Sequence, residues 1–343
     1  MKQTKKILVT GGLGYIGSHT VVALQQAGYE VVIIDDLSNT QIAVLENITK
    51  ITNVMPEFHP IDLKNTEAVD QFFNDNKIDG IIHFAAYKAV GESVKKPLMY
   101  YRNNLSGLIN VLEAMEKYGV DHFIFSSSCT VYGQADQMPI NEKTPLKRPE
   151  APYGKTKHMG EEIIGDFVEA EQKNAIALRY FNPVGAHSSA LIGELPNGIP
   201  NNLIPYITQT ASGIRGSLGV FGNDYETRDG TAIRDYIDVN DLADAHVKAL
   251  NRLLTKENKN ALEYFNLGSG TGSTVLEMIE AFEKANNLKV PYEIKDRRAG
   301  DIQEAYADYS LAKKELNWEP NTPLETSMKT AWAFECKINE TIG

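Results

Sequence analysis

The stretch Gly11-Gly-Leu-Gly14-Tyr-Ile-Gly17 directly follows a short apolar run, residues 7–10, and opens a helical pattern over residues 15–27. Glycines at this spacing allow a tight turn, a close approach of the backbone to a pyrophosphate and close packing of helix on strand. The amides at the start of the helix then stay free for phosphate oxygens. The stretch therefore predicts a dinucleotide-binding unit, with Tyr15 and Ile16 beside the glycines.

Two acidic residues at the end of the next strand, Asp35 and Asp36, bear on the choice of dinucleotide. A carboxylate at this place accepts hydrogen bonds from the adenosine ribose and repels a 2′-phosphate. No Arg or Lys follows until Lys50. The sequence therefore predicts NAD rather than NADP, and we expect Asp62 and Leu63, after the following strand, to meet the adenine ring.

Short apolar runs alternate with helical patterns through the first half of the chain. We predict strands at residues 7–10, 30–35, 80–85, 122–126 and 175–181, and helices at residues 15–27, 66–76, 98–118 and 153–170. Such alternation requires right-handed crossovers and places helices on both faces of a parallel sheet. The predicted fold class is α/β, a doubly wound (Rossmann) parallel sheet.

Beyond residue 181 the alternation gives way to segments rich in Gly, Pro and Asn. A further helix is expected at residues 239–254, and a strand and a helix within residues 264–285. Long loops of this kind often bind ligands. We expect an NAD-binding domain over residues 1–181, to which later segments can return, and a smaller interleaved substrate lobe over residues 182–343.

Composition limits the partners. The chain has 343 residues and a net charge of −11, and its Lys and Arg are dispersed, which argues against nucleic acid. No apolar run approaches the roughly 20 residues of a membrane span, and the apolar start is too short for a signal-peptide core. The two cysteines and seven histidines show no metal-ligand spacing. We expect a cytoplasmic protein without disulfide or metal.

The catalytic candidates are Tyr153 and Lys157, which share one helix face because they are four residues apart. A nearby ammonium and a positively charged nicotinamide should lower the pKa of the phenol from about 10, which would make it a base. Tyr309 and Lys313 have the same spacing. Only Tyr153 follows the strand that ends in Ser126-Ser-Ser-Cys-Thr130, where a doubly wound fold places its ligand, so we interpret Tyr309 as structural.

These motifs resemble the extended short-chain dehydrogenase/reductase family, and within it the UDP-glucose 4-epimerases. The resemblance covers essentially the whole chain, and the run Tyr180-Phe-Asn-Pro-Val-Gly185 is highly specific. Further matching segments are His83-Phe-Ala-Ala-Tyr-Lys-Ala-Val-Gly-Glu-Ser93, Ser128-Cys-Thr-Val-Tyr-Gly133, Arg179-Tyr-Phe-Asn-Pro-Val-Gly-Ala-His187 and Phe221-Gly-Asn-Asp-Tyr225.

The resemblance implies an isomerase of galactose and other carbohydrate metabolism. Tyr153 would take the proton of the sugar 4-hydroxyl while the C4 hydride passes to NAD, and the 4-keto sugar would turn over and take the hydride back. Ser128 would relay the proton, and Lys157 would hold the nicotinamide ribose and tune the tyrosine. The site must then hold UDP firmly and the hexose loosely.

The resemblance also assigns further binding residues. On the cofactor side they are Phe84, Ala85, Lys88, Asn103, Ser126 and Tyr180. On the UDP-sugar side they are Phe181, Asn182, Asn201, Asn202, Leu203, Phe221, Arg234, Tyr236, Arg298, Asp301 and Ala305. The two arginines suit phosphate oxygens and Phe221 suits uracil. Without the resemblance, Arg234-Asp235 would be read as a surface ion pair and Phe221 as core.

Ala305 corresponds in this family to a size gate beside the 2-substituent of the sugar. Alanine leaves room, so we expect conversion of UDP-GalNAc and UDP-GlcNAc as well, unless the adjacent Tyr306 fills the gap. The family also implies a homodimer that pairs through the helices at residues 98–118 and 153–170. Both carry apolar stripes, as sheet-facing helices also do.

Two alternatives remain. A sugar-nucleotide 4,6-dehydratase or decarboxylase of the same fold would place acidic residues just after the serine strand, where this chain has Cys129-Thr130. A dinucleotide-sensing binding protein without chemistry would be expected to lack Tyr153 or Lys157.

Overall fold

The computed structural model describes residues 4–298 and 301–342, so the outer ends of the two expected domains, Met1 and Gly343, lie outside the described residues. Within these residues, seven parallel strands form the main sheet in the order β10-β6-β5-β4-β1-β2-β3. The strands are β1 (Lys6–Thr10), β2 (Glu30–Ile34), β3 (Glu57–His59), β4 (Gly80–His83), β5 (His122–Ser126), β6 (Asn174–Tyr180) and β10 (Leu262–Leu267).

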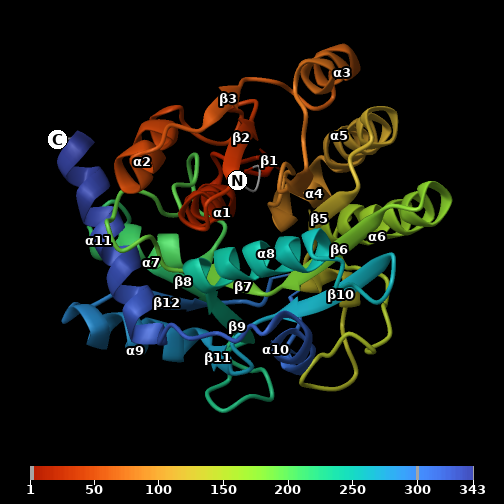
Figure 1. The fold of residues 1–343 in the computed structure, drawn as a ribbon. Helices are drawn as coiled ribbons and strands as arrows, with labels where there is room; N and C mark the ends of the chain where they lie inside the picture. The colour runs from red at the N-terminus through yellow and green to blue at the C-terminus, as the bar shows by residue number, and fades with distance from the viewer. Residues whose placement is uncertain (1–3, 299–300, 343) are drawn as a thin grey trace.

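Helices cover both faces of this sheet (Figure 1). One face carries α1 (Tyr15–Gln26), α2 (Ala43–Thr52) and α8 (Val239–Leu254), and the other carries α3 (Thr66–Asp75), α5 (Pro97–Tyr118) and α6 (Pro152–Glu171). Successive residues of a strand point to opposite faces, so Ile7 and Val9 enter one core and Leu8 the other. This explains the continuous apolar runs in the sequence and confirms the predicted doubly wound fold.

The second half of the chain builds a smaller lobe around β9 (Ile233–Asp238), which pairs with β7 (Asn182–Val184), β11 (Gly272–Thr274) and β13 (Glu304–Ala305). A separate pair joins β8 (Leu218–Phe221) to β12 (Tyr292–Lys295). The helices of this half, besides α8, are α7 (Leu203–Ala211), α9 (Val275–Asn286), α10 (Ser310–Leu316) and α11 (Leu324–Ile342).

Later segments of the chain also join the main sheet. Helix α8 packs against α1, and β10 pairs with β6 at the edge of the sheet. Two short elements of the first half complete the inventory, namely α4 (Val90–Lys95) and the 3-10 turn η1 (Cys129–Tyr132). Because all strands of the main sheet run in one direction, the loops after β1, β2, β4 and β5 meet at one edge.

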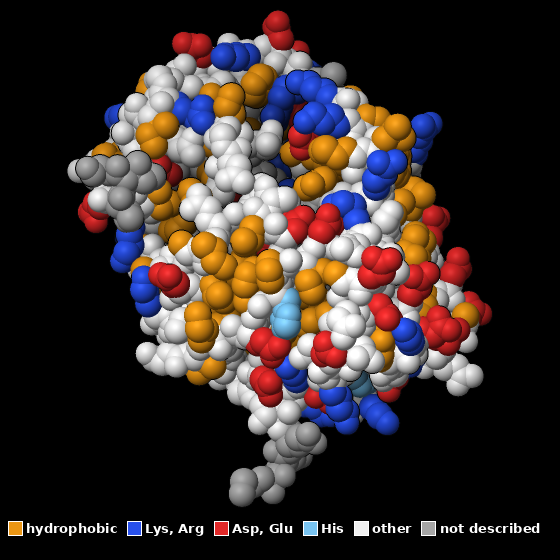
Figure 2. Space-filling view, turned by 90° about the horizontal axis from the view of Figure 1, so that it is seen from above, with side chains coloured by type: hydrophobic (Ala, Val, Ile, Leu, Met, Phe, Trp, Pro, Cys, Tyr) orange, Lys and Arg blue, Asp and Glu red, His pale blue; other side chains and the backbone are white. Residues whose placement is uncertain are grey.

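The surface carries both signs of charge. Figure 2 shows one face, on which acidic and basic side chains are interspersed around a central area of hydrophobic side chains. This pattern differs from the continuous basic surface that is typical of nucleic-acid binding. Among the described residues, no helix combines the length and the apolar character that a membrane crossing requires.

Candidate active site

Two glycines leave no room for a side chain, namely Gly11 in the turn between β1 and α1 and Gly17 in the first turn of α1. Gly11 has a φ of +69°, and a Cβ atom there would lie 2.8 Å from the amide nitrogen of Ala85. A Cβ on Gly17 would lie 2.2 Å from the carbonyl oxygen of Gly11. No side chain caps the start of α1 at Gly14, so the first turn of the helix remains available to an anion.

The turn opens into a cavity of about 300 Å³. All the predicted cofactor residues line it, namely Gly11, Gly14, Tyr15, Ile16, Gly17, Asp35, Asp36, Asp62, Leu63, Phe84, Ala85, Lys88, Asn103, Ser126, Tyr153, Lys157 and Tyr180. Of the predicted substrate residues, Ser128, Phe181, Asn182 and Asn202 also line it, whereas Asn201 and Leu203 only flank Asn202. The cavity therefore joins the glycine turn to the catalytic candidates.

Asp35 closes the end of the cavity beside β2. Its carboxylate accepts hydrogen bonds from the backbone amides of Leu13 (3.1 Å) and Leu37 (3.0 Å). Burial raises the pKa of Asp35, and these two hydrogen bonds act against the rise. The side chain is thus fixed in place and retains acceptor capacity for ribose hydroxyls.

Sequence reasoning missed Lys64, which also lines this end of the cavity. Its ammonium lies 2.9 Å from Asp62 and donates a hydrogen bond of 2.8 Å to the side-chain oxygen of Asn103. The signal was available, because Lys64 directly follows Asp62-Leu63 at the strand end. The pairing with Asn103 joins residues far apart in sequence and could not be read from it.

Ser128, Tyr153 and Lys157 meet at the opposite end of the cavity, beside β5 and β6. Ser128 follows β5, and the other two lie on the first turns of α6. The ammonium of Lys157 donates a hydrogen bond of 2.5 Å to the carbonyl oxygen of Ser126 and lies 4.9 Å from the ring centroid of Phe125. The hydroxyls of Ser126 and Tyr180 are 2.5 Å apart. Lys157 is thus oriented by the end of the strand.

Burial is the largest influence of the protein on the pKa values of Tyr153 and Lys157. Burial raises the pKa of Tyr153, the neighbouring Tyr180 adds to the rise, and the nearby Ser128 hydroxyl acts in the opposite direction. Burial also lowers the pKa of Lys157 to about 7, although the negative charge of Glu161 works against this shift. The protein groups alone therefore favour a neutral phenol, because both charged forms are poorly solvated here.

A buried ion pair behind the serines was not foreseen. Arg179 on β6 donates two hydrogen bonds to Glu161 on α6, at 2.9 and 2.6 Å, and both side chains are less than 5% exposed. Ser127 donates to the same carboxylate at 2.5 Å, and Arg179 also donates to the Tyr132 hydroxyl at 3.0 Å. Glu161 lies one helical turn beyond Lys157, and this spacing was the only feature of the sequence that placed Glu161 near the catalytic candidates.

The remaining UDP-side candidates form a second cluster in the smaller lobe. The guanidinium of Arg298 lies 4.6 Å from the ring centroid of Phe221 and 3.0 Å from a carboxylate oxygen of Asp301. The guanidinium of Arg234 approaches the other oxygen of Asp301 at 3.8 Å. Tyr236 is buried on the same strand as Arg234. Two cations thus share one carboxylate, which leaves a surplus of positive charge for phosphate.

The simple interpretation of Arg234-Asp235 as a surface ion pair is wrong. Asp235 is fully buried and accepts hydrogen bonds from the amides of Ser269, Gly270 and Ala307. It therefore joins β9 to the segment that carries Ala305.

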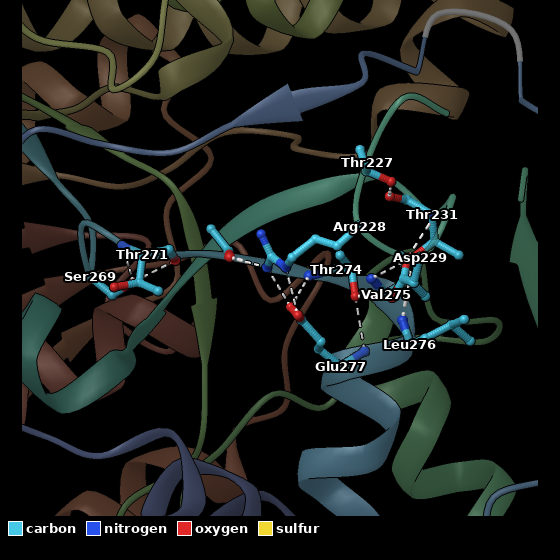
Figure 3. A network of polar contacts seen from close by, with 11 residues as sticks. Thr227, Arg228, Asp229, Thr231, Ser269, Thr271, Thr274, Val275, Leu276 and Glu277 are labelled. Atoms are coloured by element: carbon cyan, nitrogen blue, oxygen red, sulfur yellow. Dashed lines mark hydrogen bonds and ion pairs between the residues drawn. The ribbon is translucent and has the colours of Figure 1, made fainter. Parts of the chain in front are cut away.

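The loop between β8 and β9 is held against the start of α9 (Figure 3). Arg228 donates two hydrogen bonds to Glu277, at 2.7 and 2.5 Å. The carboxylate of Asp229 accepts from Thr231 at 2.8 Å and from Thr274, the N-cap of α9, at 2.5 Å. These contacts fix the loop that joins the two strands carrying predicted substrate residues.

Ala305 packs beside the end of the cavity that holds the catalytic candidates. It is buried in a cluster with Phe181 and Cys129, which both line the cavity. The ring of Tyr306, the residue after β13, lies beside Gly272 on β11, where an added Cβ would be 3.1 Å from it. Tyr309 packs against Trp318, with ring centroids 6.2 Å apart, and neither Tyr309 nor Lys313 lines the cavity.

Comparison with known proteins decides the family. Residues 8–331 match the family model described as GDP-mannose 4,6 dehydratase. The UDP-glucose 4-epimerase of Bacillus subtilis is 52% identical over 330 residues, which are 96% of each chain. The chain belongs to the UDP-glucose 4-epimerase family.

Solved structures agree with this membership in the epimerase family. The UDP-glucose 4-epimerase of Stenotrophomonas maltophila, with bound NAD and formylated UDP-arabinopyranose, has a TM-score of 0.95 and 45% identity, with 98% of this chain and 99% of that one covered. The enzyme of Bifidobacterium longum, in complex with NAD+ and UDP, has a TM-score of 0.93 and 43% identity, with 97% and 98% covered. The similarity therefore extends over both lobes.

A substitution in the glycine turn tests the cofactor site directly. We expect Gly17→Ala to weaken binding of NAD by about tenfold or more, because the new Cβ forces the turn away from Gly11. The matched control is Gly91→Ala on α4, where a Cβ meets no atom within 4 Å. Calorimetric titration with NAD measures both. Unchanged NAD affinity in Gly17→Ala would contradict the assignment.

Proposed function

We propose that this protein catalyses the reversible, NAD-dependent 4-epimerisation of UDP-galactose and UDP-glucose. The observation that carries the proposal is one cavity that is lined both by the glycine turn and by Ser128, Tyr153 and Lys157. A dinucleotide that binds the glycine turn can extend within this cavity to the tyrosine.

The protein groups suit NAD as the resident cofactor. The glycine turn leaves the start of α1 to the pyrophosphate, and Asp35 offers a carboxylate to the ribose. The two related epimerase structures described above contain NAD or NAD+. When bound, NAD would supply the hydride acceptor and donor for the sugar, and its positive charge would favour the phenolate form of Tyr153.

The residues at the reacting end then have distinct tasks. Tyr153 removes the proton from the 4-hydroxyl, and Ser128 shortens the path of that proton. Lys157, which Ser126 orients, holds the ribose next to the nicotinamide and keeps a positive charge near the phenol. The proton and the hydride both return to the sugar after it has turned, so the reaction has no net oxidation.

The smaller lobe suits an anchor for UDP. We propose that Arg234 and Arg298 bind the diphosphate, that Phe221 contacts uracil, and that Tyr236 and Asp301 complete this site. The shared carboxylate of Asp301 holds both guanidinium groups close together before any ligand binds. The group around Ala305 is apolar, which leaves the hexose few fixed hydrogen bonds and lets it turn. On this basis we propose that residues 182–343, apart from the segments that return to the main sheet, form the UDP-sugar lobe.

Elimination chemistry is a weaker alternative, although the matching family model has the name of a dehydratase. The residues after Ser128 are Cys129 and Thr130, and burial raises the pKa of the Cys129 thiol to about 12. Among the described residues, the acids that line the cavity are Asp35, Asp36 and Asp62, all beside β2 and β3. A 4-keto sugar at Tyr153 would therefore have none of these described acids beside it.

We further propose that N-acetylated substrates are accepted. Ala305 has a small side chain that packs with Phe181 and Cys129, whereas the ring of Tyr306 lies beside Gly272. This space beside the sugar end suits the acetamido group of UDP-GalNAc or UDP-GlcNAc.

Two further aspects are proposals. A homodimer through α5 and α6 is supported by the exposed Leu98, Ile109 and Met159 on these two helices, which pack against each other. A mass of twice the chain mass in sedimentation equilibrium would support the dimer, and a monomer mass would contradict it.

A cytoplasmic location fits the free thiols of Cys129 and Cys336, because oxidising compartments favour disulfides.

The first test is product identification by proton NMR after incubation with UDP-galactose. We expect UDP-glucose to form, and Tyr153→Phe to lower kcat by about 100-fold or more, because the base is lost. The control is Tyr309→Phe, which removes a hydroxyl from the other tyrosine with the same lysine spacing and should leave kcat unchanged. No reaction with NAD supplied would refute the proposed function.

The second test concerns sugar size. We expect Ala305→Tyr to reduce conversion of UDP-GalNAc by about 100-fold through steric exclusion, with conversion of UDP-galactose within about threefold of the unmodified protein. Tyr306→Phe should change neither rate, because that ring faces Gly272. Intact N-acetyl activity in Ala305→Tyr would show that the gate lies elsewhere.

A further inference from the structure

Glu194 connects the two lobes at the edge of the cavity. One oxygen of its carboxylate accepts hydrogen bonds from the ammonium of Lys88 (2.8 Å) and from the side-chain amide of Asn202 (2.6 Å). Lys88 follows β4 in the nucleotide-binding domain, and Asn202 precedes α7 in the smaller lobe. Both line the cavity, the first as a cofactor candidate and the second as a substrate candidate.

The backbone that carries Glu194 is firmly anchored. Gly193 forms a bridge with Ala186, and a Cβ on Gly193 would lie 2.5 Å from the ring of Phe334 on α11. Ile192 is fully buried in the main core. The side chain of Glu194 is 11% exposed, compared with 45% for Lys88. Glu194 is therefore the fixed partner, and it sets the position of the more accessible lysine.

Both partners keep donors for a ligand after they bind Glu194. An ammonium has three N–H groups and a side-chain amide has two, and the bond to Glu194 uses one of each. The side chain of Asn202 does not cap α7, so its amide oxygen is also available to accept a hydrogen bond from a ligand. Lys88 also lies 5.9 Å from the ring centroid of Tyr15, which donates a hydrogen bond of 2.7 Å to the carbonyl oxygen of Gly185.

We propose that Glu194 is a positioning residue that couples the binding of NAD to the binding of UDP. The proposal rests on the proposed function, because that function places both ligands in one cavity. Because one oxygen of Glu194 holds both Lys88 and Asn202, a cofactor that binds Lys88 stabilises the arrangement in which Asn202 is presented to UDP. Since coupling free energies are reciprocal, UDP must strengthen the binding of NAD by the same factor.

The test measures how fast NAD leaves the reconstituted holoenzyme after rapid removal of free NAD, with and without saturating UDP. We expect UDP to slow this release by about fivefold or more in the unmodified protein. In Glu194→Gln we expect an effect below about twofold, because the neutral amide loses the charge that holds Lys88. Lys88→Met removes the other half of the contact and should behave in the same way.

The matched control is Glu283→Gln on α9, which breaks a 2.6 Å ion pair with Lys289 at a similarly shielded carboxylate, 16% exposed, that does not line the cavity. It should keep the full effect of UDP. If Glu194→Gln does not fold, Lys88→Met carries the test alone, since it alters a half-exposed side chain. Coupling that persists in either variant, or is absent from the unmodified protein, would overturn the proposal. Failure to convert UDP-galactose would instead count against the proposed function, because the coupling is measured without turnover.

Discussion

The geometry of the catalytic candidates at the end of β5 depends on the buried ion pair between Arg179 and Glu161. It joins β6 to α6, and Ser127 bonds to the same carboxylate, so the end of β5 is held between them. Charges this deeply buried are stable only when fully paired, and removal of one partner of such a pair typically destabilises a protein by about 3–5 kcal/mol. The position of Tyr153 and Lys157 relative to Ser128 follows from this constraint, because α6 cannot shift along the sheet without breaking it.

The rest of the site is built outward from this rigid frame. The parallel sheet brings the loops after β1, β2, β4 and β5 to one edge, so cofactor residues that are far apart in the chain line one cavity. The smaller lobe adds a cationic cluster at Arg234 and Arg298. A separate hydrogen-bond network fixes the loop between β8 and β9, which leads to the strand that carries Arg234. The rigid sites for the cofactor and for UDP, with an apolar region between them, suit a reaction in which NAD and UDP stay in place while the hexose turns.

Much of this architecture could be predicted from the sequence. The apolar runs at residues 7–10 and 122–126 are strands because successive side chains enter two different cores, and this pattern is local. The glycine turn was likewise readable, since its sterics involve near neighbours. The cavity also contains every residue that the family resemblance assigned to the cofactor.

The parts that sequence reasoning missed all involve pairing over long distances in the chain. Nothing in the spacing indicates that Lys157 bonds to the Ser126 carbonyl, that Asp235 accepts from Ala307, or that Lys64 reaches Asn103. The rise that burial causes in the pKa of Tyr153 was also not readable from the sequence, because helix spacing describes neighbours and says nothing of desolvation.

The central claim is that the hydrogen on C4 leaves the sugar and returns to the same carbon within one closed site. The most direct measurement uses UDP-galactose deuterated at C4, in ordinary water with excess unlabelled NAD, and follows the label by NMR and mass spectrometry. The account predicts UDP-glucose that retains the deuterium at C4 throughout the approach to equilibrium. Exchange of the label into solvent or into free NAD, or its appearance at another carbon, would contradict it.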